Sequence, residues 1–379
     1  MDDRTLVRAV NGLTARWARE AMGGSRTGAT VFSAAGVWPL LALLAAGAAG
    51  PARAELEQAV GTDAATAAGA SGPLLARLDG MDGIDTAVGL WTRATLPLVP
   101  GWLSLLPAGA HGRFTGDAAV DRKTLDAWAA DRTDGMIPRM PVAVDRDTLL
   151  LLANALALRT DWAEPFRDHH TGRLFRSTPH LDMAGVAGTP FGPLTMAKVN
   201  GTSGLEVHLL LGPDHVAPGE VIAAGVGALD GAYQVLPGNL LPYGRPGPGV
   251  TVEDVTSFSP APALDLTTVP FTIDAEHDLL EHDALFGLRT ARNSGAGHFP
   301  GISGPQPLAV GAAKQSATAT FSATGFRAAA VTAISMIAGS APGQAHQARR
   351  VRVEFLRPFG FLAVHRRFPV VLVAGWVTP

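Results

Sequence analysis

The first part of the chain shows a helical pattern of hydrophobic residues. An apolar side chain recurs every three or four positions, at Leu6, Val10, Leu13 and Trp17. Asp2 and Asp3 precede this pattern as candidate N-caps, so it predicts an amphipathic helix. Shorter helices are expected over 55–60 and over 122–130, where Leu125 and Trp128 fall on one face.

Residues 27–52 carry no charge over 26 positions, which is long enough to span a bilayer. The segment also ends in Pro-Ala-Arg-Ala, which imitates a leader cleavage site. Ala and Gly dominate the run, however, and its strongly apolar centre, 37–44, is short. The preceding residues are of mixed charge, unlike the basic start of a leader. We therefore expect a core helix packed tightly on all sides, with a leader or a membrane span as alternatives.

Residues 149–158 read LLLLANALAL, a continuous apolar run interrupted by Asn154. A run of this length is typical of either a buried helix or a strand covered on both faces. In both cases Asn154 needs buried hydrogen-bond partners, because an unpaired amide costs about 1–3 kcal/mol.

The C-terminal part is expected to be rich in strands. Residues 212–250 contain the strongest cluster of Gly and Pro and predict loops, and a short helix is expected over 276–287. Strand patterns fall at 264–273, 317–322, 351–355, 359–364 and 370–376. The chain therefore predicts an α+β fold, helical early and sheet-rich late.

Composition excludes several classes of protein. The 379 residues carry 30 basic and 33 acidic side chains, a net charge of −3, which argues against polyanion binding as the main role. The absence of cysteine removes disulfides, thiolate metal sites and cysteine nucleophiles.

The sequence contains no complete catalytic or metal-binding motif. The chain has no nucleophile elbow, P-loop or dinucleotide-binding glycine motif. His277 and His282 are five positions apart, which on a helix would point the two imidazoles apart, so surface histidines are expected. His169 and His170 are expected to be a loop pair. We therefore expect no enzyme activity, no metal and no cofactor.

A run of arginines near the C-terminus could bind a polyanion, but a solvated strand face is the preferred interpretation. The run comprises Arg349, Arg350, Arg352 and Arg357, joined later by Arg366 and Arg367.

Several segments together resemble the serpins, the serine protease inhibitor superfamily, in a bacterial-type form. LDAWAADRTDGMIPRMP at 125–141 is similar to the family's Trp-containing helix and the turn after it. LLLLANALALRTDWAEPF at 149–166 is similar to the strand with a central Asn, a Trp and a Phe. LEVHLLL, LDLTTVPFTID and FPGISG follow in the family's order. FLRPFGFLAV at 355–364 is similar to the family signature through Arg357, Pro358 and Phe359.

The resemblance implies one serpin domain over 1–379, with helices packed around a large central mixed β-sheet, smaller sheets, and an exposed reactive loop at about 323–349. It also implies that 27–52 is core, because Phe32-Ser33 corresponds to the start of a central buried helix. In this family a protease cleaves the loop while covalently attached to it, and the loop then inserts into the main sheet as a new strand. The catalysis belongs to the protease.

The resemblance assigns the loop hinge to a segment of small residues after Gly325. The hinge residues are Gly325, Phe326, Arg327, Ala328, Ala329, Ala330, Val331 and Thr332. A small residue is usual where this chain has Phe326, so we expect overpacking of about 1–3 kcal/mol on insertion. The buried network that the loop must open reads Ser33, Asn154 and Gln315, with Gly36 where a second Ser is usual. These departures favour an alternative, a non-inhibitory serpin-fold protein that binds a ligand or partner.

Counting from the hinge places the reactive bond at Gly339-Ser340, and counting back from Arg357 places it at 343–347. Met336, Ile337 and Ala338 suit elastase-, chymotrypsin- or subtilisin-like proteases. No Arg or Lys lies between Arg327 and Arg349, which argues against trypsin-like targets. A loop that is merely cleavable remains an alternative.

The expected partner is a serine protease. We expect a monomer with no nucleic-acid or membrane partner. No leader is recognised, which predicts the cytoplasm, while the resemblance leaves an extracellular location open.

Overall fold

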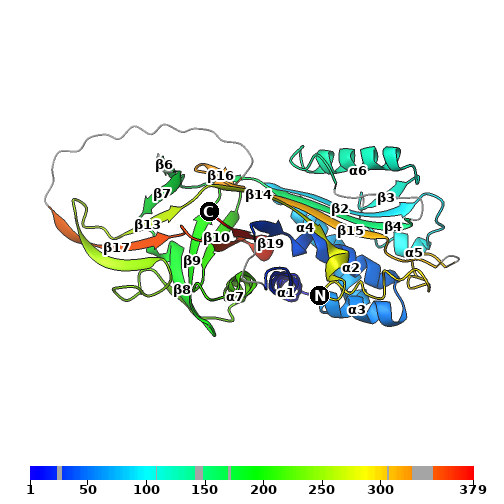
Figure 1. The fold of residues 1–379 in the computed structure, drawn as a ribbon, viewed down its shortest axis with the longest axis horizontal. Helices are drawn as coiled ribbons and strands as arrows, with labels where there is room; N and C mark the ends of the chain where they lie inside the picture. Colours follow the sequence, from blue (N-terminus) through cyan, green and yellow to red (C-terminus); the bar gives the residue numbers. More distant parts are fainter. Residues whose placement is uncertain (24–27, 108, 141–147, 170–171, 305–306, 327–344) are drawn as a thin grey trace.

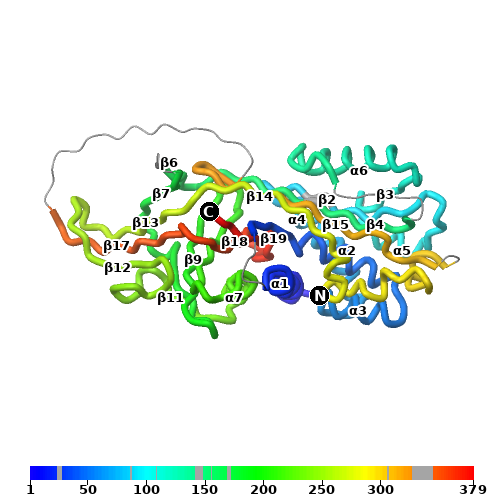
Figure 2. The backbone as a smooth tube through the Cα atoms, viewed as in Figure 1, coloured from blue at the N-terminus to red at the C-terminus, as the bar shows by residue number. Residues whose placement is uncertain are grey.

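The computed structural model describes residues 1–23, 28–107, 109–140, 148–169, 172–304, 307–326 and 345–379. These residues form seven α-helices and three β-sheets (Figures 1 and 2). The helices are α1 (Asp3–Ala21), α2 (Ala34–Gly47), α3 (Gly50–Val60), α4 (Ala64–Asp79), α5 (Pro100–Leu103), α6 (Ala118–Arg132) and α7 (Pro218–Leu229). Two short 3-10 helices lie at Leu181–Met183 and Leu279–His282.

The strands divide into three sheets. The first has the order β1 (Thr30–Phe32), β19 (Phe368–Val377), β18 (Phe359–His365), β10 (Leu205–Leu211), β9 (Gly192–Asn200), β8 (Ala184–Thr189) and β11 (Val235–Pro237). The second has the order β12 (Val250–Ser257), β17 (His346–Glu354), β13 (Ala263–Thr268), β7 (Arg173–Thr178) and β6 (Arg167–His169). The third, called the main sheet below, has the order β3 (His111–Phe114), β2 (Ile84–Arg93), β4 (Leu150–Leu158), β15 (Ala312–Phe321), β16 (Gly325–Phe326) and β5 (Thr160–Asp161), with β14 (Phe271–Asp278) also paired to β15.

The apolar run at 149–158 is a strand, β4, at the centre of the main sheet. Helix α6 covers one face of this sheet, where Leu125 and Ala129 pack with Leu151 and Ala153. Helices α2 and α4 lie on the opposite face (Figure 1). Because both faces are covered, β4 has no polar side, and this explains its continuous apolar sequence.

The described part of the uncharged segment, 28–52, contains β1, all of α2 and the start of α3. Ser33 caps α2, whose residues are almost all buried among the other helices and the main sheet. Among the described residues no helix is long and apolar enough to cross a membrane. The prediction of a core helix is confirmed, as is the amphipathic helix α1 with Asp2 as its N-cap.

Three predictions about secondary structure were wrong. Helix α7 lies within 212–250, which was expected to consist of loops, and begins at Pro218, a residue suited to the first helical turn. The strand expected over 264–273 is two strands in different sheets, separated at Pro270, which has no N–H to donate. The helix expected over 276–287 is absent because β14 continues to Asp278 in register with β15, followed only by one 3-10 turn.

His277 is not a surface histidine, contrary to the prediction. Its ring lies edge-on to Trp17 with 5.3 Å between centroids, and its Nε2 is 2.9 Å from the carbonyl oxygen of Val31. Burial lowers the pKa of His277. His282 points elsewhere and lies 3.7 Å from Glu20, so the two imidazoles do not form a joint site.

Glu206 of β10 is a buried carboxylate with two basic neighbours. Arg366 Nε donates to it at 2.8 Å, and His208 Nε2 lies 3.5 Å away. Burial alone would raise the pKa of Glu206, but the interactions with His208 and Arg366 outweigh burial and lower the pKa to about 2. The ionised form is therefore favoured by folding.

We predict that Glu206→Gln lowers the free energy of unfolding at pH 7 by about 1–3 kcal/mol. The folded pKa lies below the usual value, so this stabilisation is present above about pH 4.5 and is lost as the pH falls toward 2. Urea unfolding of both proteins at pH 7 and at pH 3 measures the difference. A gap that stays constant or widens at pH 3 would contradict this account.

Candidate functional site

Strands β4 and β15 are joined by a buried network under the main sheet. They pair directly and in parallel, with Gln315 opposite Asn154. Gln315 Nε2 donates to Asn154 Oδ1 at 2.7 Å and to the carbonyl oxygen of Ser33 at 2.8 Å. Its Oε1 accepts from the Ser33 N–H at 2.8 Å. Both amide side chains are fully buried, so this network fixes the two strands to each other and to the start of α2.

Gly36 has no room for a side chain. A Cβ at this position would overlap the amide of Asn154. Ser33 Oγ meanwhile accepts from the Gly36 N–H at 3.2 Å as the cap of α2. The Asn154 side chain thus occupies the space that a second serine would need, and this accounts for the departure from the family pattern at Gly36.

The first two residues of the predicted hinge form a short strand, β16, at one end of the main sheet. A tight turn joins it to β15, held by Ser322 Oγ, which donates to the Gly325 carbonyl at 3.0 Å and accepts from the Gly325 N–H at 3.2 Å. Phe326 pairs with Phe321 of β15 on one side and with Thr160 of β5 on the other, antiparallel to both. Residues 325–326 of the predicted hinge therefore lie inside the sheet.

Phe326 is buried in an aromatic cluster. Its side chain is 1% exposed. Its ring centroid lies 6.4 Å from that of Trp162 and 6.0 Å from that of Phe361. The sequence predicted a ring that insertion would force into the core, but the ring already has a place there. Gly325 is required beside it, since a Cβ would overlap the carbonyl of Thr160.

The reactive loop predicted at about 323–349 overlaps a strand at each end. Residues 325–326 lie in β16 and 346–349 lie in β17. The other predicted residues of the hinge, specificity segment and reactive bond lie outside the described residues: Arg327, Ala328, Ala329, Ala330, Val331, Thr332, Met336, Ile337, Ala338, Gly339 and Ser340.

The arginine run is largely neutralised by acidic partners. Arg352 lies 2.6 Å from Glu253, and Arg350 lies 3.3 Å from Asp265. Arg349 donates to the carbonyl of Leu241. The run therefore does not form a free surface for binding a polyanion.

Arg357 and its neighbours in the signature hold two parts of the first sheet together. Arg357 Nη1 lies 2.8 Å from Asp214, and its Nη2 donates to the carbonyl of Gly212. Phe359 is fully buried at the start of β18. These positions indicate a structural role.

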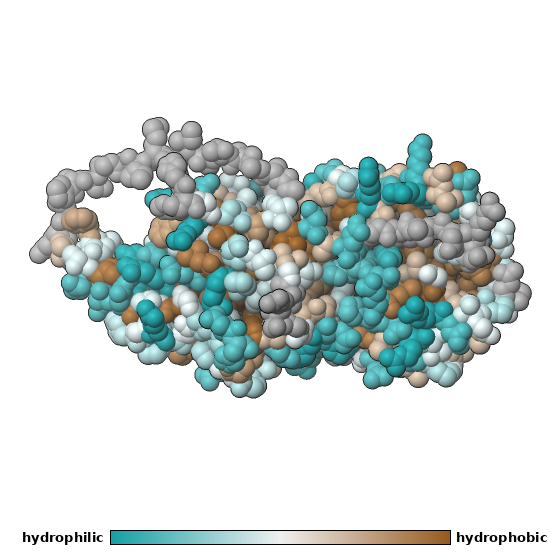
Figure 3. Space-filling model, viewed as in Figure 1, coloured by the Kyte–Doolittle hydropathy of each residue, from teal (hydrophilic) through white to brown (hydrophobic). Residues whose placement is uncertain are grey.

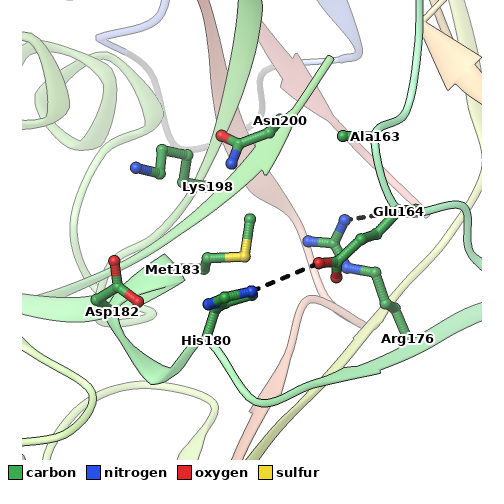
Figure 4. Close-up of a pocket in the computed structure, with 8 residues that line it drawn as sticks. All are labelled: Ala163, Glu164, Arg176, His180, Asp182, Met183, Lys198 and Asn200. Carbon is green, nitrogen blue, oxygen red and sulfur yellow. Dashed lines mark hydrogen bonds and ion pairs between the residues drawn. The ribbon is translucent and has the colours of Figure 1, made fainter. Parts of the chain in front are cut away.

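Sequence reasoning missed a cavity of about 190 Å³ near the turn at 180–183 (Figure 4). Arg176, at a core-facing position of β7, points toward it and is only 4% exposed. Its Nη1 donates to the carbonyl of Glu164 at 3.0 Å, while its Nε and Nη2 have no partner among the described residues. Lys198 and His180 lie around the same space. The described residues contain no group of His, Asp or Glu side chains that could hold a metal ion.

We predict that Gly36→Ala destabilises the protein by about 1–3 kcal/mol, because the new methyl group displaces Asn154 from Gln315. Gly69→Ala is the matched control. It lies on an exposed face of α4 with nothing near its Cβ position, and should stabilise by about 0.5–1 kcal/mol. Urea unfolding measures both. Equal effects of the two substitutions would show that the network does not depend on Gly36.

Comparison with known proteins gives the same picture as the geometry. The family model described as "Serpin (serine protease inhibitor)" matches residues 8–178. The leukocyte elastase inhibitor of Xenopus laevis is 40% identical over 52 residues, a match that spans 13% of this chain and 14% of that relative's length.

Solved serpin structures match along the whole chain. Serpin48 of the insect Tenebrio molitor has a TM-score of 0.72 at 17% identity, covering 100% of this chain and 99% of that one. Native protease nexin-1 with heparin has a TM-score of 0.73 at 15% identity, with 100% of both chains covered. Human thyroxine-binding globulin, complexed with thyroxine, has a TM-score of 0.72 at 15% identity, with 99% of both covered. Residues 8–178 therefore match the serpin family model, and the chain as a whole has the serpin fold.

Proposed function

We propose that the whole chain, residues 1–379, is a serine protease inhibitor whose segment 327–344 is the reactive loop. A serine protease attacks this loop, and the cleaved loop inserts between β4 and β15. The observation that carries the proposal is the position of β16, which is antiparallel to both neighbours, the orientation that an inserted strand would take.

The existing registers support insertion without any sliding of strands. Phe326 opposes Phe321 and Thr160. If both ladders were extended by six residues, Thr332 would lie opposite Gln315 on one side and Asn154 on the other. Gln315 and Asn154 are already partners in the β4–β15 ladder. The two strands therefore need only to separate, and Thr332 would then enter between the two amides that hold them together.

The same count assigns a face to each loop residue. Side chains alternate along a strand, so Ala328, Ala330 and Thr332 would face the core together with Phe326. They would lie beside Ala319, Ala317 and Gln315 of β15, all of which are buried. Arg327 would fall on the opposite face. The small side chains of the predicted hinge would thus lie at the buried positions, where there is least space for a side chain.

The anchoring of β17 explains why insertion would wait for cleavage. Strand β17 is paired on both sides, with β12 along eight residues and with β13 along five. It begins at the end of the molecule opposite to the start of β4 and β15 (Figure 1). Insertion down to 336 would leave ten residues to return to His346, a span of at most about 35 Å. An intact loop held by β17 would therefore be too short.

We predict that Ala330→Glu abolishes trapping, because insertion would bury its charge beside Ala317 and Leu156. Ala329→Glu is the control, since residue 329 would face outward beside the partly exposed Thr318. Each protein is incubated with subtilisin or elastase and run on a denaturing gel. Wild type and Ala329→Glu should give a stable higher-mass adduct, whereas Ala330→Glu should give only cleaved chain.

Two outcomes of this experiment would be decisive against the proposal. If wild type gives only cleaved chain, the protein is not an inhibitor of these proteases. If Ala330→Glu traps as well as Ala329→Glu, the register is not the one proposed.

A second candidate is ligand binding by a non-inhibitory serpin. The observation that favours it is the cavity beside Arg176, where a buried cation has two donor groups without partners among the described residues. Thermal melting before and after loop cleavage separates the two functions. A large rise in melting temperature on cleavage supports insertion, and little change supports the ligand-binding alternative.

A further inference from the structure

The three most exposed large hydrophobic side chains of the described residues lie near strand β12. Phe258 follows this strand directly, and the segment that carries Leu240 and Tyr243 bridges it between Gly244 and Val252. Leu240 is 62% exposed, Tyr243 is 57% exposed and Phe258 is 73% exposed. We call these three residues the apolar strip. Phe258 has the largest exposed fraction of any large hydrophobic side chain in the described residues. Figure 3 shows hydrophobic residues among hydrophilic ones at the end of the molecule where Figure 2 places β12 and β17.

The tip that carries Phe258 is held in a fixed shape. Phe258 follows β12 directly, and Pro260 and Pro262 restrict the backbone after it. The Ser259 N–H donates to Ser257 Oγ at 3.2 Å, and the Ala261 N–H donates to Ser259 Oγ at 3.3 Å. A side chain held out to solvent on a rigid tip loses little conformational freedom on binding, so it is suited to recognition.

Tyr243 is also fixed in place. Its hydroxyl lies 3.0 Å from Asp254 of β12, and the guanidinium of Arg349 lies 4.8 Å from the centre of its ring. Arg349 also bonds the carbonyl of Leu241, next to Leu240. Aromatic and arginine side chains of this kind are enriched at the centres of protein interfaces.

The Phe258 end of the apolar strip lies beside the start of β17. Ser257, the last residue of β12, pairs with His346, the first residue of β17. From the proposed reactive bond at Gly339-Ser340 to His346 the chain spans at most about 20–25 Å. A protease domain of about 220 residues has a radius of gyration of about 17 Å, so its body is wider than this span.

We propose that the apolar strip is a second contact surface for the protease that attacks the loop. This inference rests on the proposed function of segment 327–344 as the reactive loop. The protease it fits has a shallow apolar depression beside its active-site cleft, able to accept an aromatic ring. Contact there holds the first, non-covalent complex in place and raises the rate of loop cleavage.

The test compares Phe258→Ser with Val120→Ser, which removes a 51% exposed apolar residue from α6, on a different part of the surface. The second-order rate constant of loop cleavage is measured for wild type and both variants with subtilisin, elastase and chymotrypsin. Circular dichroism melting checks that both variants fold. We expect Phe258→Ser to slow cleavage about tenfold with at least one protease, as for loss of an aromatic anchor, and Val120→Ser to have no effect.

Several results would overturn the inference. The first is equal cleavage rates for the two variants with all three proteases. The second is a slower rate that comes with a change in oligomeric state on size-exclusion chromatography, which would assign the strip to contact between copies of this chain. Failure of wild type to be cleaved by any of the three would remove this inference and the proposed function together. The experiment measures the rate of cleavage and not the formation of an adduct. A chain that is cleaved without forming an adduct would therefore refute the proposed inhibition, while the effect of Phe258 on the cleavage rate would still be measured.

Discussion

The structure depends on the hydrogen bonds that Gln315 makes to Asn154 and Ser33. They are fully buried, so no water competes for them, and breaking them would take these partners from the Gln315 amide at a cost of about 1–3 kcal/mol. They close the main sheet at the place where the proposed mechanism needs it to open. A strand that enters there must supply new partners for both amides, and the register offers them the hydroxyl and backbone of Thr332.

The two anchors of the loop are unequal, and this gives the proposed mechanism its direction. At one end β16 is only two residues long, but it already lies in the main sheet with Phe326 buried. At the other end β17 is held between two strands and by the ion pairs of Arg350 and Arg352. Cleavage of the loop would release the β16 side from this second anchor and leave β17 in place. Strand β12 thus has two roles in this account. It pairs with β17 and so helps to fix it, and Phe258 follows its last residue.

The sequence predicted the elements whose pattern reflects their own burial. Buried side chains recur every three or four positions in helix α1 and at about every second position in β15 and β17, because each of these elements has one covered face. The pattern could not decide between helix and strand at 149–158, since coverage of both faces removes the period. It also gave the wrong element at 276–287, where pairing of β14 with β15 overrides local preference. The site residues Ser33, Asn154 and Gln315 came from the family resemblance, but the obstruction at Gly36 and the burial of Phe326 depend on packing that no single segment encodes.

The central claim is that the cleaved loop becomes a strand between β4 and β15. A crystal structure of the protein after loop cleavage tests it most directly. The account predicts a new strand continuing from β16, antiparallel to both neighbours, with Thr332 between Gln315 and Asn154 and with Ala328 and Ala330 facing the core. A cleaved protein in which Gln315 still donates to Asn154 and β4 still pairs with β15 would contradict it.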